Sequence, residues 1–380
     1  MPSTAALIVA AGSGSRAGSG VPKQYRRLGG KAVLRHAYDA FAAHPAIGEV
    51  RIVIGAGQEQ AFGEAMAGTG TADPVTGGAE RSISVACGLE TIAADRILIH
   101  DAARPFCPPA VIDRLLGALG GHRGAVPVLP VADTLARGSA LLGEPIDRAG
   151  AVRVQTPQAF DTAAIRGAYR AWRGEGATDD ATVARAAGIE VALVAGDEAL
   201  HKLTWEEDFE AAERRIAASL TSRTGMGFDV HAFAAGDGIW LGGVHIPHER
   251  GLSGHSDADV VLHAVTDALL GAIGEGDIGD HFPPSDPQWR GAASSLFVEH
   301  ARALIAGRGG RIDHVDVTLI CEAPRIGPHR AAMRARIAAL LGLAPGRVSV
   351  KATTTERLGF TGRGEGIAAQ ALATVRLPEA

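Results

Sequence analysis

The sequence has few cysteines, few aromatic residues and no long apolar run. Three cysteines stand far apart without a CxxC pair, at Cys87, Cys107 and Cys321, which argues against a disulfide scaffold and favours a reducing compartment, the cytoplasm. No stretch reaches about 18 uninterrupted apolar residues. The short apolar run at 5–11 follows no basic segment, so we expect neither a membrane span nor a secretory signal.

Neither charge sign is in large excess. The net charge of −5 argues against a protein whose main partner is an anionic polymer, but it leaves phosphorylated small molecules open. The composition is 46% hydrophobic and 21% charged, as in ordinary globular proteins. At roughly 100–200 residues per domain, a chain of 380 residues predicts two domains.

The first 220 residues alternate short aliphatic runs with segments of helical length. Runs such as 5–11, 49–55 and 95–101 are bounded by Gly, Pro or Asp and suit strands buried on both faces. The alternation predicts an α/β domain over 1–220 with a mainly parallel sheet and covering helices. Polar residues 134–150 interrupt it and predict an excursion or arm.

The rest of the chain has a different rhythm. Residues 221–224 resemble a short linker, and the strand-like GMGFDVHAF follows them. A helical segment at 257–273 comes next, and strands and helices then mix without regular alternation. We therefore predict an α+β domain over 225–380.

A glycine-rich loop follows the first predicted strand. Gly12, Gly14 and Ala17 fit GxGxx(G/A), so a dinucleotide-binding fingerprint must be considered. The second strand, however, ends without the acidic residue that would hold a ribose. Arg16 and Lys23 lie in a loop still rich in Gly and Pro, which fits a triphosphate better, because backbone N–H groups and cations both bind phosphate. An ordinary strand–helix turn with two solvated cations is the alternative.

Four later segments add polar residues at places where a ligand could bind. HDAARPF (100–106) ends a predicted strand, where open α/β sheets bind ligands. Taken singly, each residue is more often a surface charge, an ion pair or a helix cap, and only the combination with the loop is informative. The candidates are Ser84, Asp101, Arg104, Arg148, Thr156 and Lys202.

Taken in order, these motifs resemble those of the 2-C-methyl-D-erythritol 4-phosphate cytidylyltransferase family. The matching segments are AAGxGxRxxxxxPKQY, GGxxRxxSV, HDAARP, TPQ and TDDA, over about 1–220. The resemblance implies a Rossmann-like nucleotidyltransferase fold. It also implies transfer of CMP from CTP to 2-C-methyl-D-erythritol 4-phosphate with release of diphosphate, supported by Mg²⁺ or Mn²⁺. In this family an arm from each subunit reaches the active site of a neighbouring subunit, so the resemblance implies a dimer.

The resemblance also implies roles for particular residues. Arg16 and Lys23 would hold the triphosphate, and Asp101 would contact either the substrate hydroxyls or the metal ion. The nucleotide would contact Ala10, Ala11, Gly12, Gly14, Gly78 and Ser84. The methylerythritol phosphate would contact Arg104, Arg148, Thr156 and Lys202. Ala79 departs from the family, many of whose members have a polar residue there.

In the second half, an Asp-x-His pair and a distant histidine suggest a metal site. Asp229 and His231 are two apart on a predicted strand, so their side chains leave by the same face. His263 lies on the predicted helix, with Asp259 and Asp267 at i−4 and i+4. Two imidazoles and a carboxylate suit Zn²⁺ with an open fourth position. Each histidine alone is more often structural, and the two aspartates are either partners of His263 or solvated helix charges.

Two further segments suit phosphate groups. His255 and Ser256 precede the predicted helix, where an anion could bind, although Ser256 is also a plausible N-cap. The segment 351–366 combines hydroxyls, glycines and an arginine, and it reads either as a diphosphate and cation site or as a polar turn. Its candidates are Thr353, Thr354, Glu356 and Arg363.

The second half closely resembles the 2-C-methyl-D-erythritol 2,4-cyclodiphosphate synthase family over about 224–380. The matching segments are GFDVHAF, LSGHSDADVVLHAVTDALLGA, GDIGDHFPPSD, VDVTLI and KATTTERLGFTGRGEGIA. The resemblance implies that Asp229, His231 and His263 bind zinc and that Glu356 binds Mg²⁺ or Mn²⁺. It implies a homotrimer with each site between subunits. The implied substrate contacts are His255, Ser256, Asp277, Gly279, Thr353, Thr354, Phe360 and Arg363. Pro284 and Arg325 stand where relatives often have Asp and Lys.

The expected protein is therefore a fused bifunctional enzyme of non-mevalonate isoprenoid precursor synthesis. Its second half would cyclise 4-diphosphocytidyl-2-C-methyl-D-erythritol 2-phosphate to the 2,4-cyclodiphosphate and release CMP, and a separate kinase would supply that substrate. A dimeric half joined to a trimeric half suggests a hexamer or a larger assembly. Other interpretations are a sugar-1-phosphate nucleotidyltransferase fused to a zinc phosphotransferase, a silent nucleotide or metal sensor, and a nicotinamide dehydrogenase.

Overall fold

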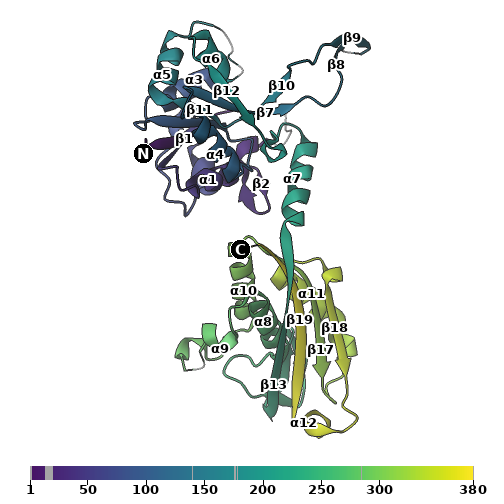
Figure 1. The fold of residues 1–380 in the computed structure, drawn as a ribbon. Helices are drawn as coiled ribbons and strands as arrows, with labels where there is room; N and C mark the ends of the chain where they lie inside the picture. Colours follow the sequence, from purple (N-terminus) through teal and green to yellow (C-terminus); the bar gives the residue numbers. More distant parts are fainter. Residues whose placement is uncertain are drawn as a thin grey trace. The chain divides into compact units, whose positions relative to one another are not determined.

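The computed structural model describes residues 2–12, 20–138, 140–174, 177, 179–283 and 285–379. The chain folds as two compact units, Met1–Ile216 and Ala217–Ala380 (Figure 1). Within the described part of the chain, no helix has both the length and the apolar character needed to cross a membrane.

The first unit is built on an eight-stranded sheet of mixed direction. Its order is β10-β7-β11-β6-β1-β4-β5, and β12 also pairs with β7. Strands β6, β1, β4 and β5 are parallel neighbours, as are β7 and β12. Strand β10 pairs antiparallel with β7, and β11 pairs antiparallel with both β6 and β7. The strands are β1 (Thr4–Ala10), β4 (Glu49–Ile54), β5 (Val75–Thr76), β6 (Arg96–Asp101), β7 (Gly124–Pro130), β10 (Val152–Val154), β11 (Gln158–Asp161) and β12 (Val191–Ala195). The mainly parallel α/β prediction is confirmed.

Helices cover both faces of this sheet because its central strands are apolar on both sides. In β1, Ala6 and Ile8 enter one core, and Ala5 and Leu7 enter the other, as the period of two requires. The first core includes residues of α1 (Val33–Ala42), α2 (Glu59–Ala65) and α4 (Pro109–Ala118). The second includes residues of α3 (Arg81–Leu89), α5 (Thr162–Ala171) and α6 (Asp180–Ala186).

Smaller elements complete the first unit. Strands β8 (Leu135–Gly138) and β9 (Leu142–Ile146) pair with each other and form the arm that extends from the sheet in Figure 1, within the predicted excursion. Helix α7 (Glu206–Ala218) packs Phe209 and Ala212 on Leu28 and Val33. The remaining segments are η2 (Lys23–Tyr25), β2 (Arg27–Leu28), β3 (Lys31–Ala32) and η3 (Glu198–Leu200).

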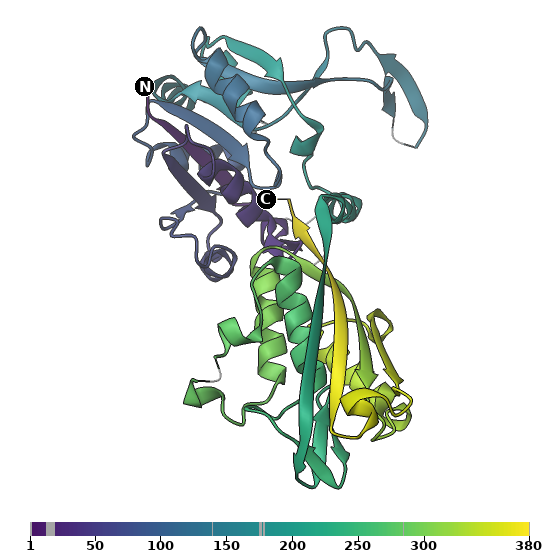
Figure 2. The same cartoon turned by 60° about the horizontal axis from the view of Figure 1, so that its bottom comes forward.

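The second unit has a five-stranded sheet in the order β16-β13-β19-β17-β18. Strands β13 and β19 run side by side along their length (Figure 2). The strands are β13 (Leu220–Ala235), β16 (Arg250–Leu252), β17 (Arg311–Ile320), β18 (Val348–Thr353) and β19 (Gly366–Pro378), and β14 (Gly238–Leu241) pairs with β15 (Val244–Pro247). The helices are α8 (Val260–Ile273), α9 (Ile278–His281), α10 (Ser295–Gly307), α11 (Arg330–Leu341), α12 (Gly359–Gly362), η4 (Pro287–Trp289), η5 (Gly327–His329) and η6 (Pro345–Arg347).

The predicted linker at 221–224 is corrected by the structure. These residues lie inside β13, where Thr221 pairs with Leu377 and Thr224 with Thr374. They are polar and exposed, which makes the segment look like a linker in the sequence. A distant strand supplies their hydrogen-bond partners, so the segment is extended, and the compact units divide between Ile216 and Ala217.

Glycines on β13 let α8 lie directly on the strand. A Cβ atom on Gly225 would stand 2.2 Å from the carbonyl oxygen of Ala268, and one on Gly227 would stand 2.0 Å from that of Ala264. Both distances are far below van der Waals contact, so only glycine fits. This close approach places the middle of α8 next to the strand residues that follow Gly227.

Candidate active sites

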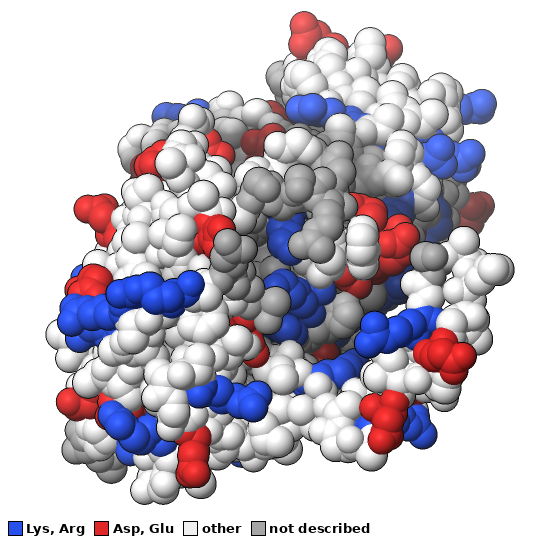
Figure 3. All heavy atoms as spheres, turned by 90° about the horizontal axis from the view of Figure 1, so that it is seen from above, with Lys and Arg blue, Asp and Glu red and all other residues white. Residues whose placement is uncertain are grey.

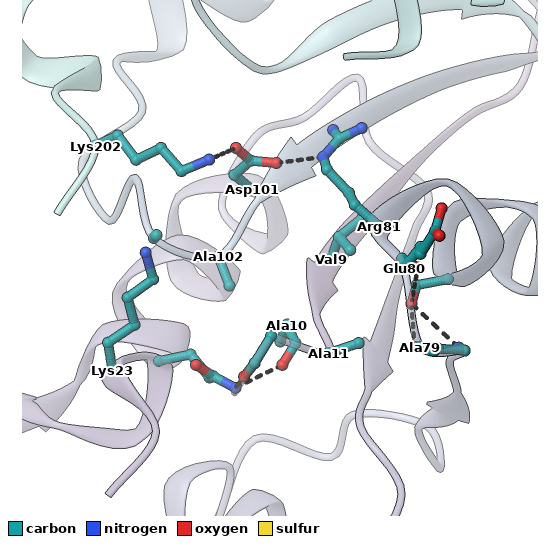
Figure 4. A pocket seen from close by; sticks show the side chains of 15 residues that line it. Val9, Ala10, Ala11, Lys23, Ala79, Glu80, Arg81, Asp101, Ala102 and Lys202 are labelled. Carbon is teal, nitrogen blue, oxygen red and sulfur yellow. Dashed lines mark hydrogen bonds and ion pairs between the residues drawn. The ribbon is translucent and has the colours of Figure 1, made fainter. Parts of the chain in front are cut away.

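The first unit has a pocket at the carboxyl ends of β1 and β6 (Figure 4). Its volume is about 260 Å³. Figure 3 shows Lys and Arg side chains, with Asp and Glu side chains among them, around a hollow on the face that it presents, and the cations suit an anionic ligand. The predicted residues that line the pocket are Ala10, Ala11, Gly12, Lys23, Gly78, Ser84, Asp101 and Lys202.

Asp101 is the central charged group of this pocket. Its Oδ2 accepts a hydrogen bond from Lys202 Nζ at 2.7 Å, and its Oδ1 accepts one from Arg81 Nε at 2.9 Å. Burial disfavours the charged form, but the two cations outweigh burial and hold the pKa of Asp101 well below its usual range. The carboxylate is therefore ionised at neutral pH, and each of its oxygens accepts one hydrogen bond from a cation.

Side-chain hydrogen bonds shape the pocket wall. Gln24 Nε2 donates to the carbonyls of Ala10 at 2.7 Å and Gly12 at 2.8 Å, which fixes the chain as it leaves β1. The hydroxyl of Ser84 meets the backbone N–H of Gly78 at 3.2 Å, which closes the turn before α3. The sequence predictions named Ser84 but missed Gln24, although the PKQY motif contained it.

The hydroxyl group of Thr156 forms hydrogen bonds within the protein. Its Oγ accepts from the Asp101 backbone N–H at 3.1 Å and lies 3.2 Å from His100 Nδ1. His100 Nε2 lies 2.8 Å from the carbonyl oxygen of Arg104, which can only accept, so Nε2 carries the proton and the Thr156 hydroxyl donates to Nδ1. Burial lowers the pKa of His100 to about 4. Thr156 therefore orders the site backbone rather than presenting a free hydroxyl.

Arg104 and Arg148 are not among the described residues that line this pocket. Arg104 is partly buried, and its guanidinium donates to the carbonyl of Leu200 at 2.5 Å. Arg148 lies beyond β9 and donates to the carbonyl of Ala132, and it does not line the described pocket. Arg16 and Gly14 lie outside the described residues.

In the second unit, Asp229, His231 and His263 converge. One ligand atom from each lies within 4.8 Å of the others. His263 Nδ1 lies 2.9 Å from Asp229 Oδ2 and 3.1 Å from His231 Nε2. The strand places the first two on one face, and the close packing of α8 brings the third beside them. This group could hold a metal ion.

The hydrogen bonds around these residues prepare their nitrogen atoms for such a role. His231 Nδ1 donates to the carbonyl oxygen of Ser253 at 2.7 Å, which leaves Nε2 as the ring nitrogen that faces Asp229 and His263 and that would coordinate a metal ion once deprotonated. Burial opposes ionisation of Asp229, but hydrogen bonds from both histidines hold its pKa well below the usual range. Burial likewise lowers the pKa of His231, yet the bond to Asp229 reverses this and raises it.

Serine side chains orient His263, and the two predicted aspartates do not. Its Nε2 lies 2.9 Å from both Ser256 Oγ and Ser294 Oγ. Asp259 instead caps α8 and accepts from the N–H groups of Val261 and Leu262 at 3.1 Å. The Ser256 N-cap alternative is therefore corrected, because the Asp259 carboxylate fills that place at the start of the helix.

Asp267 also forms a hydrogen bond with the backbone. Its Oδ1 accepts from the N–H of Ile278 at 2.8 Å, and desolvation by burial raises its pKa. Asp277 caps α9 by accepting from the N–H groups of Gly279 and Asp280. Both carboxylates thus shape the segment that borders the cluster of Asp229, His231 and His263.

A second cavity of about 600 Å³ opens beside this cluster. His231 and His263 line one side of it, and aromatic side chains line another wall. Among the aromatic residues, the Phe282 and Trp289 rings meet edge to face with centroids 4.9 Å apart. The predicted contacts His255, Ser256 and Gly279 also line the cavity.

The other predicted residues of this half form a separate group. Thr354 Oγ donates to Glu356 Oε1 at 2.6 Å, and Arg363 pairs with Glu365 at 2.7 Å. These residues, with Thr353 and Phe360, are not among the described residues that line the cavity of the same chain. Of the departures from the family, Ala79 lines the first pocket, Arg325 is exposed, and Pro284 lies outside the described residues.

Two family models match the chain along its length. The model described as 2-C-methyl-D-erythritol 4-phosphate cytidylyltransferase matches residues 4–218, and the YgbB family model matches 222–376. The bifunctional enzyme IspD/IspF of Rhizorhabdus wittichii is 67% identical over 99% of this chain and 98% of that protein. The chain belongs to the bifunctional IspD/IspF family. It is therefore a cytidylyltransferase and a cyclodiphosphate synthase of the methylerythritol phosphate pathway, acting on small molecules.

Other comparisons extend this result. The bifunctional enzyme IspD/IspF of Novosphingobium aromaticivorans is 56% identical and covers 98% of this chain and 97% of that protein. The solved structure of the bifunctional IspDF from Campylobacter jejuni is 31% identical, with a TM-score of 0.50, and covers 99% of this chain and 98% of that one. The predicted fold classes and the two activities are thus confirmed for the IspD and IspF halves.

Proposed function

We propose that the IspD half transfers CMP from CTP to 2-C-methyl-D-erythritol 4-phosphate and releases diphosphate. The IspF half cyclises 4-diphosphocytidyl-2-C-methyl-D-erythritol 2-phosphate to the 2,4-cyclodiphosphate and releases CMP. The observation that carries this proposal is that one chain combines a pocket with Lys23 and Lys202 on its wall and a separate Asp–His–His cluster. A separate kinase supplies the second substrate.

In the first reaction, the IspD half acts through position and charge. Lys23, together with Arg16, neutralises the triphosphate, and the wall from Ala10 to Gly12 and around Gly78 and Ser84 receives the nucleoside. Lys202 offsets repulsion as the substrate phosphate attacks the α-phosphorus in line. Because the neighbouring cations hold the pKa of Asp101 far below neutrality, its carboxylate is a weak proton acceptor, and it orients substrate hydroxyls or a Mg²⁺ or Mn²⁺ ion rather than acting as a general base.

The second reaction depends on the cluster in the IspF half. One carboxylate oxygen and two imidazole nitrogens form a donor set that fits Zn²⁺ and leaves a tetrahedral position open. When bound there, zinc supplies Lewis-acid polarisation of a phosphate. His255 and Ser256 hold phosphate oxygens in the adjoining cavity, and the aromatic wall excludes water. Asp277 and Gly279 hold the erythritol part.

We infer that the IspF sites are completed between subunits of a trimer. Thr353, Thr354, Phe360 and Arg363 contact the nucleotide side of a neighbour's substrate, and Glu356 binds Mg²⁺ or Mn²⁺. The outer face of the IspF sheet supports this assembly because Met226 and Phe228 are 59% and 52% exposed there.

The arm of the IspD half contacts a second subunit in a dimer, which brings Arg148 to its site. The exposed leucines of the arm, Leu141 and Leu142, are consistent with that contact. Dimers and trimers together give a hexamer or a larger assembly. The free cysteines are consistent with a cytoplasmic enzyme.

Separate variants of each site test the proposal. His231→Ala should abolish cyclodiphosphate formation and leave CTP-dependent diphosphate release intact, and Lys202→Ala should do the reverse. Both are measured on the full chain with authentic substrates and phosphorus NMR of the products. Loss of both reactions in either variant would contradict two independent sites, and turnover of UTP or GTP equal to that of CTP would contradict the assigned nucleotide.

A further inference from the structure

Asp180 is a fully buried carboxylate in the IspD half that none of the roles above uses. It is the first residue of α6, within the TDDA motif, and it is 0% exposed. Its two oxygens accept from Arg81 Nη1 at 2.9 Å and Nη2 at 2.7 Å, and the Tyr169 hydroxyl donates to Oδ1 at 2.6 Å. Such a buried charge is tolerated only where it is paired, and here the pairing is bidentate.

Arg81 connects this buried carboxylate to the pocket. Two of its nitrogens face Asp180, and the third, Nε, donates to Asp101 Oδ1 at 2.9 Å (Figure 4). The guanidinium group is planar, so a two-point bond to Asp180 also fixes the direction in which Nε points. A lysine at this place would supply one charge but could not hold both carboxylates in fixed directions.

The four groups form a row of alternating charge. Asp180, Arg81, Asp101 and Lys202 carry one charge each and sum to zero, so the pocket carboxylate is balanced from both sides. Burial disfavours the Arg81 cation, but its two carboxylate partners outweigh burial and raise its pKa. Without the Asp180 charge, the guanidinium is free to turn toward the pocket, and Asp101 loses its fixed direction.

We propose that Asp180 and Arg81 are positioning residues for cytidylyl transfer, acting by holding the Asp101 carboxylate in its catalytic direction. The inference rests on the role proposed for Asp101. It predicts an effect on kcat rather than on the KM for CTP, because the side-chain bonds that the described structure gives the nucleoside wall join Ser84 to Gly78 and Glu80 and include no member of this row. A misplacement of about 1 Å in such a group can reduce the rate about 100-fold.

A double-mutant cycle on the full chain tests the inference. Asp180→Asn should lower kcat for diphosphate release about 10- to 100-fold, with the KM for CTP changed less than about 2-fold. In the Asp101→Asn background the same substitution should have almost no further effect, because its target is already lost. Equal effects of Asp180→Asn in both backgrounds, or an unchanged kcat, would overturn the inference.

Two further variants separate positioning from folding. Arg81→Lys keeps a cation beside Asp180 and should lower kcat by a similar factor. It therefore still tests the inference if the Asp180→Asn protein does not fold. Arg166→Lys is the matched control, because Arg166 is another partly buried arginine, bound to the carbonyl of Leu89, and should leave kcat unchanged. A wild-type kcat in Arg81→Lys would overturn the inference. An unaffected Asp101→Asn enzyme would overturn the role of Asp101 itself and the inference with it.

Discussion

Ser294 Oγ lies 2.9 Å from His263 Nε2, on the side of the imidazole opposite the atom that faces Asp229. Ser294 is itself held by Asp257, which accepts from its backbone N–H at 3.1 Å and from its hydroxyl. This series of hydrogen bonds from Asp257 through Ser294 to His263 fixes the imidazole ring so that Nδ1 points toward Asp229 and His231. Hydrogen bonds of this kind fix the tautomer and the orientation of a ligand histidine.

Ser294→Ala is therefore expected to weaken zinc binding about 10-fold, the lower end of the range for such partners, because Ser256 still contacts the ring. Zinc affinity is measured by chelator competition, and cyclodiphosphate formation should fall in parallel at limiting zinc. Ser295→Ala is the control, since the described structure gives Ser295 no bond to His263. Equal zinc affinities of the two variants would contradict the role of Ser294.

Gly227→Ala should disturb the IspF half at a distance from its ligands. The added methyl group would stand 2.0 Å from the Ala264 carbonyl oxygen and 2.8 Å from the Ala268 nitrogen, so α8 must move away from β13. Overpacking of this kind costs about 1–3 kcal/mol or more. His263 moves with α8, so zinc affinity should fall together with the free energy of unfolding in urea.

Gly307→Ala provides the comparison. Gly307 lies in α10, and its added methyl group would meet no atom within 4 Å. This variant should keep both stability and zinc affinity. A Gly227→Ala protein as stable as Gly307→Ala would show that the contact between α8 and β13 is not needed.

The sequence predicted those features that depend on local pattern. The period of two along a strand placed Asp229 and His231 on one face, and the aliphatic runs predicted the central strands of the IspD sheet. His263 was a candidate third ligand by residue type, and the family resemblance implied that it joins the other two, because spacing alone could not bring it to the strand.

Features that depend on distant partners were missed or misjudged. Arg81 and Asp180 are 99 residues apart, and each alone reads as a surface charge. Residues 221–224 looked like a linker because their partner strand lies about 150 residues later. Thr156 remains a predicted ligand contact, but its bonds to His100 and to the backbone of Asp101, which β6 brings to it, could not be predicted from sequence spacing.

His100 should make the stability of the IspD half depend on pH. Burial lowers the pKa of His100 from 6.5 to about 4, so between these values the unfolded chain binds a proton that the folded chain excludes. Stability is therefore fully present above about pH 6.5 and is lost as the pH falls toward 4, by up to about 3 kcal/mol.

The slope of the unfolding free energy with pH measures this contribution. His100→Asn should flatten the slope between pH 6.5 and 4 even where it lowers stability overall. His36, whose pKa is also lowered by burial, remains in the variant and leaves a residual slope. A slope unchanged by the substitution would show that His100 becomes protonated in the folded protein.

Phe228→Lys should break the assembly of the IspF halves. Phe228 is 52% exposed on the outer face of the sheet, beside Met226, whereas the opposite face packs against α8. A lysine there is compatible with a solvated sheet but not with an apolar interface, where its charge would be buried unpaired. Light scattering should show a smaller particle. Cyclodiphosphate formation should fall at least about 10-fold, because a site that lacks its neighbour's residues loses at least one contact worth about 1.4 kcal/mol. Diphosphate release by the IspD half should persist.

Leu296→Lys is the matched control for this surface. Leu296 is 49% exposed and lies on α10, away from the sheet face that carries Phe228. This variant should keep the mass and the cyclase rate of the wild-type protein, because its charge enters water. If Phe228→Lys retained the wild-type mass and rate as well, the outer sheet face would be a solvated surface, and the residues from Thr353 to Arg363 would have to serve the site of their own chain.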